Sequence, residues 1–181
     1  MREDTKNCIT KFQIKTFANV KNIERAEQLV DKSEEIHFIS PTNVVTSSAT
    51  SHKKEKFPGV IILTNERVIF YIQLLNANHS EIFPVTEIRS IESTGNSLSG
   101  GHIIIHTISK DYDFLVSYKK AIMQSIQSTF ENIRSSASSI ASTCSKTLSE
   151  ADELVKFKNL LDQGIITEDE FNAKKKQLLG L

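Results

Sequence analysis

Two apolar runs separated by only two residues constrain the fold of this chain more than any other feature. Residues 60–64 (Val-Ile-Ile-Leu-Thr) and 67–72 (Arg-Val-Ile-Phe-Tyr-Ile) are rich in β-branched and aromatic side chains, and Asn65-Glu66 lies between them. Such runs favour strands, and a two-residue connection leaves room only for a tight turn. The sequence therefore predicts an antiparallel β-hairpin over residues 60–72.

Further strands are predicted on both sides of this hairpin. A strand at 36–47 is followed by a polar loop at 48–56 and by Pro58-Gly59, which are typical of turns. The strand patterns after the hairpin lie at 80–83, 88–94, 102–108 and 111–117. Seven strands are therefore expected, enough for a sheet that buries one face.

Helical periodicity flanks the strands. Residues 22–31 place Ile23, Ala26 and Leu29 on one stripe, which predicts a short amphipathic helix. After the last strand, apolar residues recur at spacings of three or four over about four turns. These residues are Ile122, Ile126, Phe130 and Ile133. This second helix is expected to lie against the sheet.

Residues 135–149 are dominated by Ser, Ala and Thr, which gain little from burial. We interpret them as a linker between a domain at 1–134 and a tail at 150–181. An alternative stays open, because Ala137, Ala141 and Leu148 continue a helical stripe, so the preceding helix could run through the segment.

The tail has the pattern of a helical hairpin. Ser149 with Asp152 is a candidate helix start, Leu154, Phe157, Leu160 and Leu161 form an apolar face, and Gly164 is a stop signal. Thr167 and Glu170 then have the spacing of a capping box for a second helix. Phe171, Leu178 and Leu179 of that helix are expected to face the first one.

Composition and charge argue against several classes of protein. The chain has 22 basic and 22 acidic residues, so it lacks the overall positive charge of a general nucleic-acid binder. Cys8 and Cys144 are too far apart for a disulfide framework or a zinc pattern. No apolar segment has the length of a signal sequence or a membrane span. A cytoplasmic protein is expected.

The order of one helix, seven strands and a closing helix resembles the PH-like superfold. Residues 59–70, 82–92, 100–105 and 112–114 resemble bacterial PH-like domains, particularly the YokE-like group. The resemblance covers about 26–133 and implies an α+β fold, a seven-stranded β-barrel or sandwich closed by a C-terminal helix. The closing helix has no Trp, unlike eukaryotic phosphoinositide-binding PH domains, which weakens any transfer of lipid specificity.

The tail is similar to the SHOCT (short C-terminal) family. The pattern includes Leu154, Leu160-Leu161, Gly164-Ile165-Ile166-Thr167, Glu170-Phe171, Lys174 and Leu178-Leu179. This resemblance implies a small protein-interaction or oligomerisation module, of a kind found at the ends of bacterial and phage proteins. The family's functional residues are not catalytic.

Three lysines form a candidate anion site. Lys53, Lys54 and Lys56 lie between the first two predicted strands, where many PH domains hold an inositol phosphate. Glu55 interrupts the run and no Arg is present, so we favour a solvated loop over a phosphate site.

Catalytic, metal and cofactor sites are not expected. His102 and His106 share a strand face, but no third ligand follows at suitable spacing. Neither cysteine occupies a position that would activate a thiolate. Phosphate-loop, serine-elbow and zinc-protease motifs are also absent from the sequence. The chain is therefore predicted not to be an enzyme.

The leading hypothesis is an interaction protein in which a PH-like scaffold carries a SHOCT-like hairpin. A hairpin of about thirty residues buries too little apolar area to be stable alone, so it needs a partner surface. The residues predicted to contact a second copy or another protein are Leu154, Phe157, Leu161, Ile165 and Phe171. The alternative is a peripheral membrane module that binds anionic lipid through Lys53, Lys54 and Lys56.

Overall fold

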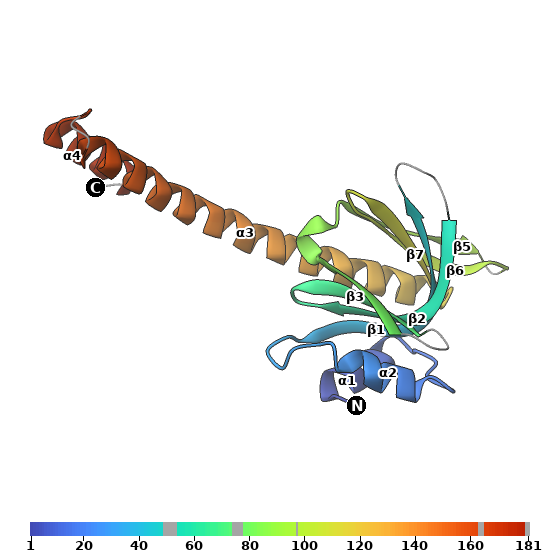
Figure 1. The fold of residues 1–181 in the computed structure, drawn as a ribbon. Helices are drawn as coiled ribbons and strands as arrows, with labels where there is room; N and C mark the ends of the chain where they lie inside the picture. The colour runs from blue at the N-terminus through green and yellow to red at the C-terminus, as the bar shows by residue number, and fades with distance from the viewer. Residues whose placement is uncertain (49–53, 74–77, 97, 163–164, 180–181) are drawn as a thin grey trace. The chain divides into compact units, whose positions relative to one another are not determined.

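The computed structural model describes residues 1–48, 54–73, 78–96, 98–162 and 165–179. The chain divides into two compact units, Met1–Ala137 and Ser138–Leu181 (Figure 1). The first unit contains the sheet and the N-terminal helices, and the second contains the C-terminal helical region. The two units are described separately below.

Seven strands form one antiparallel sheet in the first unit. The strands are β1 (Ile36–Ser48), β2 (Lys54–Thr64), β3 (Arg67–Gln73), β4 (Asn78–Pro84), β5 (Ser90–Asn96), β6 (Gly100–His106) and β7 (Lys110–Val116). Their order across the sheet is β4-β3-β2-β1-β7-β6-β5. With the helix that follows β7, this confirms the predicted fold class.

The sheet bends so that its two halves face each other (Figure 1). Phe83 of β4 stacks on Tyr112 of β7 with ring centroids 4.8 Å apart, although β3, β2 and β1 separate these strands in the sheet order. The long β1 belongs to both halves, because it pairs with β2 along most of its length and with β7 only from Val44 onward. This bend encloses the core.

Phe38 lies at the centre of that core. Its ring centroid is 5.3 Å from that of Phe12, 5.9 Å from that of Phe114 and 5.6 Å from that of Phe130. These rings come from the N-terminal segment, β1, β7 and the closing helix, and all of them are buried. The cluster therefore joins every layer of the first unit.

The polar loop predicted at 48–56 is shorter than expected. β2 already begins at Lys54, where it pairs with Ser47, and it continues through Pro58 and Gly59 without a turn. β1 extends to Ser48, and its end pairs with the start of β2. The hydrogen bonds of this ladder therefore hold polar residues at both strand ends in an extended conformation. A Cβ on Gly59 would lie 2.1 Å from the carbonyl oxygen of Tyr71, which explains a glycine inside this strand.

Two helices precede the sheet, α1 (Glu3–Lys11) and α2 (Val20–Glu27). α2 corresponds to the helix predicted at 22–31, whereas the residues of α1 carry no clear helical pattern. α1 ends in a Schellman motif, since the amide of Ile14 donates to the carbonyl of Ile9 at 3.0 Å and Gln13 takes a φ of 52°. This turn directs the chain back over the core.

An ion pair between a buried carboxylate and a partly exposed guanidinium fixes the segment between α2 and β1 to the sheet. The Glu34 side chain is 1% exposed, and its Oε1 lies 2.6 Å from Nη2 of Arg67 on β3. Arg67 also donates to the carbonyl of Leu29 at 3.2 Å and to Asp31 at 3.0 Å. The N-terminal region is thus held to the sheet by charge as well as by packing.

The closing helix α3 runs from Lys120 to Asp162, and α4 spans Glu168–Leu179. Ile122, Ile126 and Phe130 of α3 are buried against the sheet, as the sequence predicts. α3 includes residues 135–149, which is the alternative that the apolar stripe left open, so no helix begins at Ser149. The domain boundaries at 134, 149 and 150 stay predictions.

Candidate protein-interaction site

The C-terminal unit begins its last helix with the predicted capping box. The backbone amide of Thr167 donates to Oε2 of Glu170 at 2.8 Å, and the amide of Glu170 donates to Oγ1 of Thr167 at 3.3 Å. The hydrogen bond from the Thr167 backbone holds the pKa of Glu170 below its ordinary value. The predicted stop at Gly164 lies outside the described residues, but the amide of Ile165 donates back to the carbonyl of Leu160 at 2.9 Å.

The apolar side chains of this unit are only partly covered. Leu154, Phe157, Leu161 and Phe171, all predicted interaction residues, are intermediate in exposure. The fifth, Ile165, is 64% exposed, and the neighbouring Val155 is 59% exposed. Nζ of Lys174 on α4 lies 5.8 Å from the ring centroid of Phe157 on α3, so a cation covers part of that ring.

This unit has no buried core of its own among the residues whose burial is described. All of those residues between 154 and 178 are intermediate or exposed. Among the residues whose burial is described, the core cluster of the chain has no member beyond the first unit. The hairpin therefore has well-formed ends and an apolar surface that its own helices leave open.

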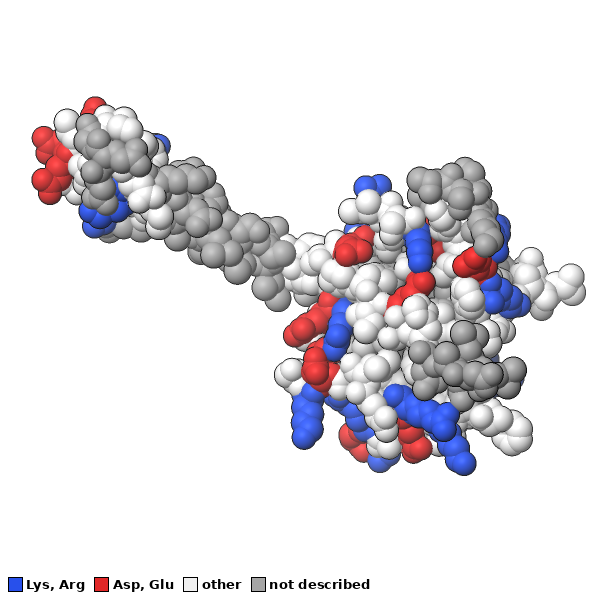
Figure 2. Space-filling view, in the orientation of Figure 1, with Lys and Arg blue, Asp and Glu red and all other residues white. Residues whose placement is uncertain are grey.

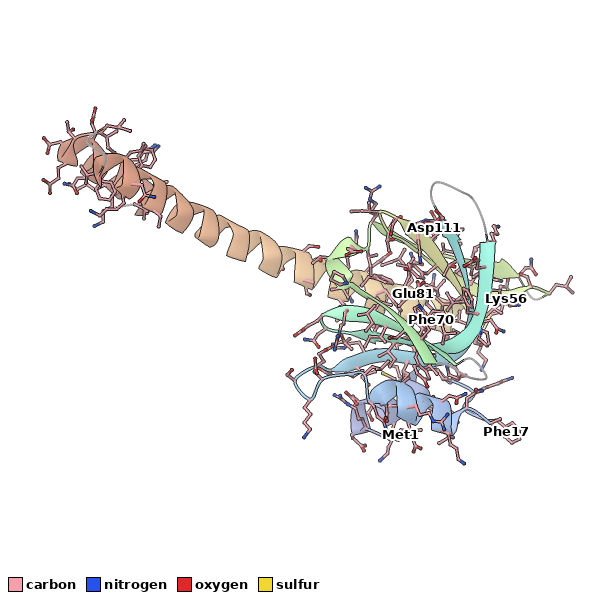
Figure 3. The ribbon with its side chains drawn as sticks, viewed as in Figure 1. Met1, Phe17, Lys56, Phe70, Glu81 and Asp111 are labelled. Carbon is pink, nitrogen blue, oxygen red and sulfur yellow. The ribbon has the colours of Figure 1, made fainter. Side chains whose placement is uncertain are left out.

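The candidate anion site lies on the first unit. Lys54 and Lys56 are exposed on β2, and Figure 3 labels Lys56. Lys53 lies outside the described residues. Lys56 pairs with Val45 of β1 in the ladder, so the two described lysines extend from a strand rather than from a flexible loop. Anion binding at this position stays a prediction.

His102 and His106 each face an aspartate of the neighbouring strand. Nδ1 of His102 is 2.7 Å from Asp113, and Nδ1 of His106 is 2.8 Å from Asp111. Within the described part of the chain, no cluster of three or more potential ligands has the geometry of a metal site. The sequence analysis missed these pairs because they depend on the register between β6 and β7.

Cys8 is buried rather than part of a polar terminus, because α1 packs on β1. Its Sγ lies 3.4 Å from the carbonyl oxygen of Ile36. Burial raises the pKa of its thiol to about 11.

We expect Cys8 to react far more slowly with iodoacetamide than a free thiol at pH 8, because both the thiolate fraction and access are reduced. In a Cys144→Ser variant, which leaves Cys8 as the one thiol, mass spectrometry should detect little alkylation until urea unfolds the chain. Rapid native labelling at the rate of a small-molecule thiol would contradict the burial of this side chain.

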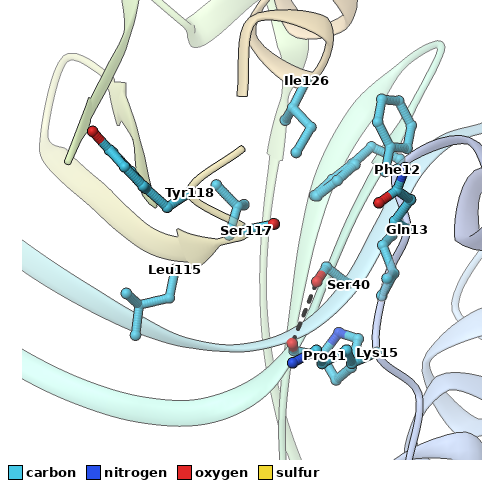
Figure 4. A pocket seen from close by; sticks show the side chains of 12 residues that line it. Phe12, Gln13, Lys15, Ser40, Pro41, Leu115, Ser117, Tyr118 and Ile126 are labelled. Atoms are coloured by element: carbon cyan, nitrogen blue, oxygen red, sulfur yellow. Dashed lines mark hydrogen bonds between the residues drawn. The ribbon is translucent and has the colours of Figure 1, made fainter. Parts of the chain in front are cut away.

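A hollow of about 420 Å³ opens beside the N-terminal segment (Figure 4). Its walls come from residues 12–15, the first half of β1, the end of β7 and Ile126 of α3. The hollow lies where the pairing of β1 with β7 stops before Val44, and there Thr42 Oγ1 donates to the carbonyl of Leu115 at 2.9 Å. Sequence reasoning missed this hollow, since four distant segments form it.

Among the described helices, none combines the length and the hydropathy that a membrane crossing requires. The comparison with protein families gives one match. Residues 152–179 match the model of the "Short C-terminal domain", SHOCT. This confirms the SHOCT resemblance of the tail. The chain as a whole has no significant match among curated protein sequences.

Several solved structures are similar in part. The Vps36 N-terminal PH domain is 18% identical, with a TM-score of 0.44, over 58% of this chain and 85% of that one. The C-terminal domain of an unknown protein from Leishmania infantum is 14% identical, with a TM-score of 0.41, over 62% and 98%. A Vav1 structure is 10% identical, with a TM-score of 0.39, over 71% of this chain, which spans 36% of that Vav1 chain.

Proposed function

We propose that this chain is a non-enzymatic, cytoplasmic interaction protein that self-associates through its SHOCT tail. In this proposal the first unit is a PH-like scaffold of the YokE-like group, in keeping with the sequence of its strands. The observation that carries the proposal is the open apolar surface of the tail, in which Ile165 is 64% exposed. A second copy of the same hairpin is the partner.

Self-association would bury the apolar surface that a single hairpin leaves exposed. Full burial of a large apolar side chain stabilises by about 1.5 to 3 kcal/mol relative to exposure. Phe157, Leu161 and Phe171 are each partly exposed, so a partner surface would gain a share of that energy from every one of them. Each copy of the hairpin contributes these contacts, and their sum acts against the translational and rotational freedom that is lost on association.

The test is the molar mass of the full chain in solution. We expect light scattering to report an oligomer for the full chain and a smaller species for a protein truncated after Ser149. Phe157→Asp should have the same effect as truncation, because a buried, unpaired carboxylate costs several kcal/mol. The matched control is Asn159→Asp, which adds the same charge at an exposed position of α3 and should leave the oligomer intact.

Equal molar mass with and without the tail at high micromolar concentration would exclude self-association. The tail would then have to bind a different protein. A pull-down with the full chain and the truncated protein, followed by mass spectrometry, would identify tail-dependent partners.

A further inference from the structure

Two large apolar side chains of the first unit are almost wholly in solvent. Phe17, between α1 and α2, is 94% exposed, and Leu98, in the turn between β5 and β6, is 99% exposed. Figure 3 shows the Phe17 side chain at the outer edge of this unit, directed away from its body. Single exposed apolar residues are common on proteins, so their placement decides whether these two matter.

Adjacent hollows lie beside the two segments that carry these side chains. The hollow of about 420 Å³ is lined by Lys15, two residues before Phe17. A second hollow of about 340 Å³ is lined by Gly95, three residues before Leu98. Tyr118, which is 46% exposed, lines both hollows. In Figure 1 the turn between β5 and β6 extends to the same side as the Phe17 side chain in Figure 3.

The segments that form this face carry only positive charge. Residues 11–23, 38–43, 93–101 and 114–124 contain no Asp or Glu, in a chain that has 22 acidic residues. They contain five lysines, which are Lys11, Lys15, Lys21, Lys119 and Lys120. We call the surface of these four segments the lysine face.

The lysines of this face are available to an external anion. All five are exposed. The contacts they make are with neutral groups, since Lys11 lies over the ring of Phe12 at 4.8 Å and Lys119 donates to Oε1 of Gln13 at 2.6 Å. Within the described residues no ion pair involves any of the five, whereas Arg2, Arg67 and Lys110 elsewhere on this unit all contact carboxylates. Figure 2 shows acidic side chains beside basic ones on the visible face of this unit.

We propose that the lysine face binds the surface of an anionic phospholipid membrane, with Phe17 and Leu98 inserted among the lipids. Such a surface has a layer of charged headgroups above an apolar acyl boundary. The two apolar side chains can enter the acyl boundary while the lysine amines contact the phosphates of the headgroups. Tyr118, which lines both hollows, has an amphipathic ring, the type of side chain that favours the headgroup level.

A membrane explains this face better than an acidic protein does. Phe17 and Leu98 project from separate loops at more than nine-tenths exposure, and neither lines one of the hollows. A protein interface usually surrounds its apolar anchors with well-packed neighbours, whereas a lipid surface accepts isolated tips. The lysines are point charges on flexible stems, suited to mobile headgroups rather than to fixed carboxylates.

This surface differs from the one that contains Lys54 and Lys56. Those lysines belong to the start of β2, where it pairs with the end of β1, and this part of the sheet adjoins the start of β7. The end of β6 pairs with the start of β7, whereas Leu98 lies in the turn that leads into the start of β6. Ile108, which is 64% exposed in the turn between β6 and β7, therefore serves as an apolar control far from the lysine face along the strands.

The absence of Trp from the chain allows a direct test with the full protein. We expect Phe17→Trp and Leu98→Trp to shift their emission to shorter wavelength with vesicles of phosphatidylcholine and phosphatidylserine, and not with phosphatidylcholine alone. Ile108→Trp should show no shift with either vesicle. Unchanged emission from both variants of the lysine face would overturn the proposal.

Co-sedimentation with the same vesicles supplies the second measurement. Phe17→Ser with Leu98→Ser, and separately Lys15→Glu with Lys120→Glu, should each weaken binding at least tenfold. Because these side chains are exposed, thermal melts of both variants should match that of the unchanged protein. Ile108→Ser should bind normally.

Two outcomes would assign the surface differently. Binding that survives both pairs of changes but disappears in Lys54→Glu with Lys56→Glu would place the lipid contact on β2 and refute the lysine face. Failure to bind either vesicle, with retention on immobilised polyglutamate that Lys15→Glu and Lys120→Glu abolish, would replace the membrane by an acidic protein.

Discussion

Replacing Phe38 with alanine should lower the free energy of unfolding of the first unit by about 3 to 5 kcal/mol. Phe38 is fully buried, with 0% of its surface exposed. The rings of Phe12, Phe114 and Phe130 surround it at centroid distances of 5.3 to 5.9 Å. Since these rings belong to different layers, the structure cannot collapse locally around the cavity, and the loss should fall at the upper end of the range.

Urea denaturation followed by circular dichroism measures this loss as a shift in the midpoint. Phe17→Ala is the matched control, because it removes the same atoms from a side chain that is 94% exposed. That control should change the free energy of unfolding by less than about 0.5 kcal/mol. A loss of about 1 kcal/mol or less for Phe38→Ala would mean that the aromatic cluster is not packed as described.

Replacing Arg67 with alanine is expected to cost about 3 to 5 kcal/mol, because it leaves the buried carboxylate of Glu34 without its partner. Arg67 contributes two bonds to Glu34, from Nε at 3.2 Å and from Nη2 at 2.6 Å. Arg25→Ala, at an exposed position on α2, is the control and should be nearly neutral. Adding Glu34→Gln to Arg67→Ala should recover part of the loss, since the amide avoids an unpaired charge.

The effect of Arg67→Ala should depend on pH. Burial alone would raise the pKa of Glu34, but hydrogen bonds from Arg67 and Thr64 outweigh it and hold the pKa below the ordinary value of 4.5. The pair therefore stabilises the native chain above pH 4.5, and this contribution is lost as the pH falls through the lowered pKa. Without Arg67, two of the interactions that lower this pKa are lost, so Glu34 protonates more readily in the variant. The difference in stability between the two proteins should therefore narrow as the pH falls toward 4.5 and below it. A difference that stays constant between pH 7 and pH 3 would show that the charge of Glu34 is not involved.

Local patterns were sufficient to predict most elements of the fold. The hairpin of β2 and β3 followed from two apolar runs with two residues between them, and the capping box of Thr167 and Glu170 from spacing alone. Alternation, helical stripes and caps act between residues that are near in sequence, so the sequence displays them directly. The same reasoning failed at β2, where ladder pairing with β1 made a strand of the polar residues from Lys54 to Lys56.

The two candidate sites also differ in whether the sequence alone could identify them. The apolar residues of the tail were identified from the sequence because one short helical hairpin contains them all. The lysine face was not identified, since gaps of 14, 49 and 12 residues separate its four segments and no one of them is unusual alone.

The sequence by itself determined the seven strands, the closing helix and the C-terminal hairpin, because each depends on residues a few positions apart. Only the tertiary structure decided which strands pair and how the sheet bends. Those choices brought Glu34 to Arg67 and His102 to Asp113, and they brought Lys15 and Gly95 to two hollows that share Tyr118. The physical reason is that strand pairing and sheet curvature depend on the packing of the whole core, which no single segment encodes.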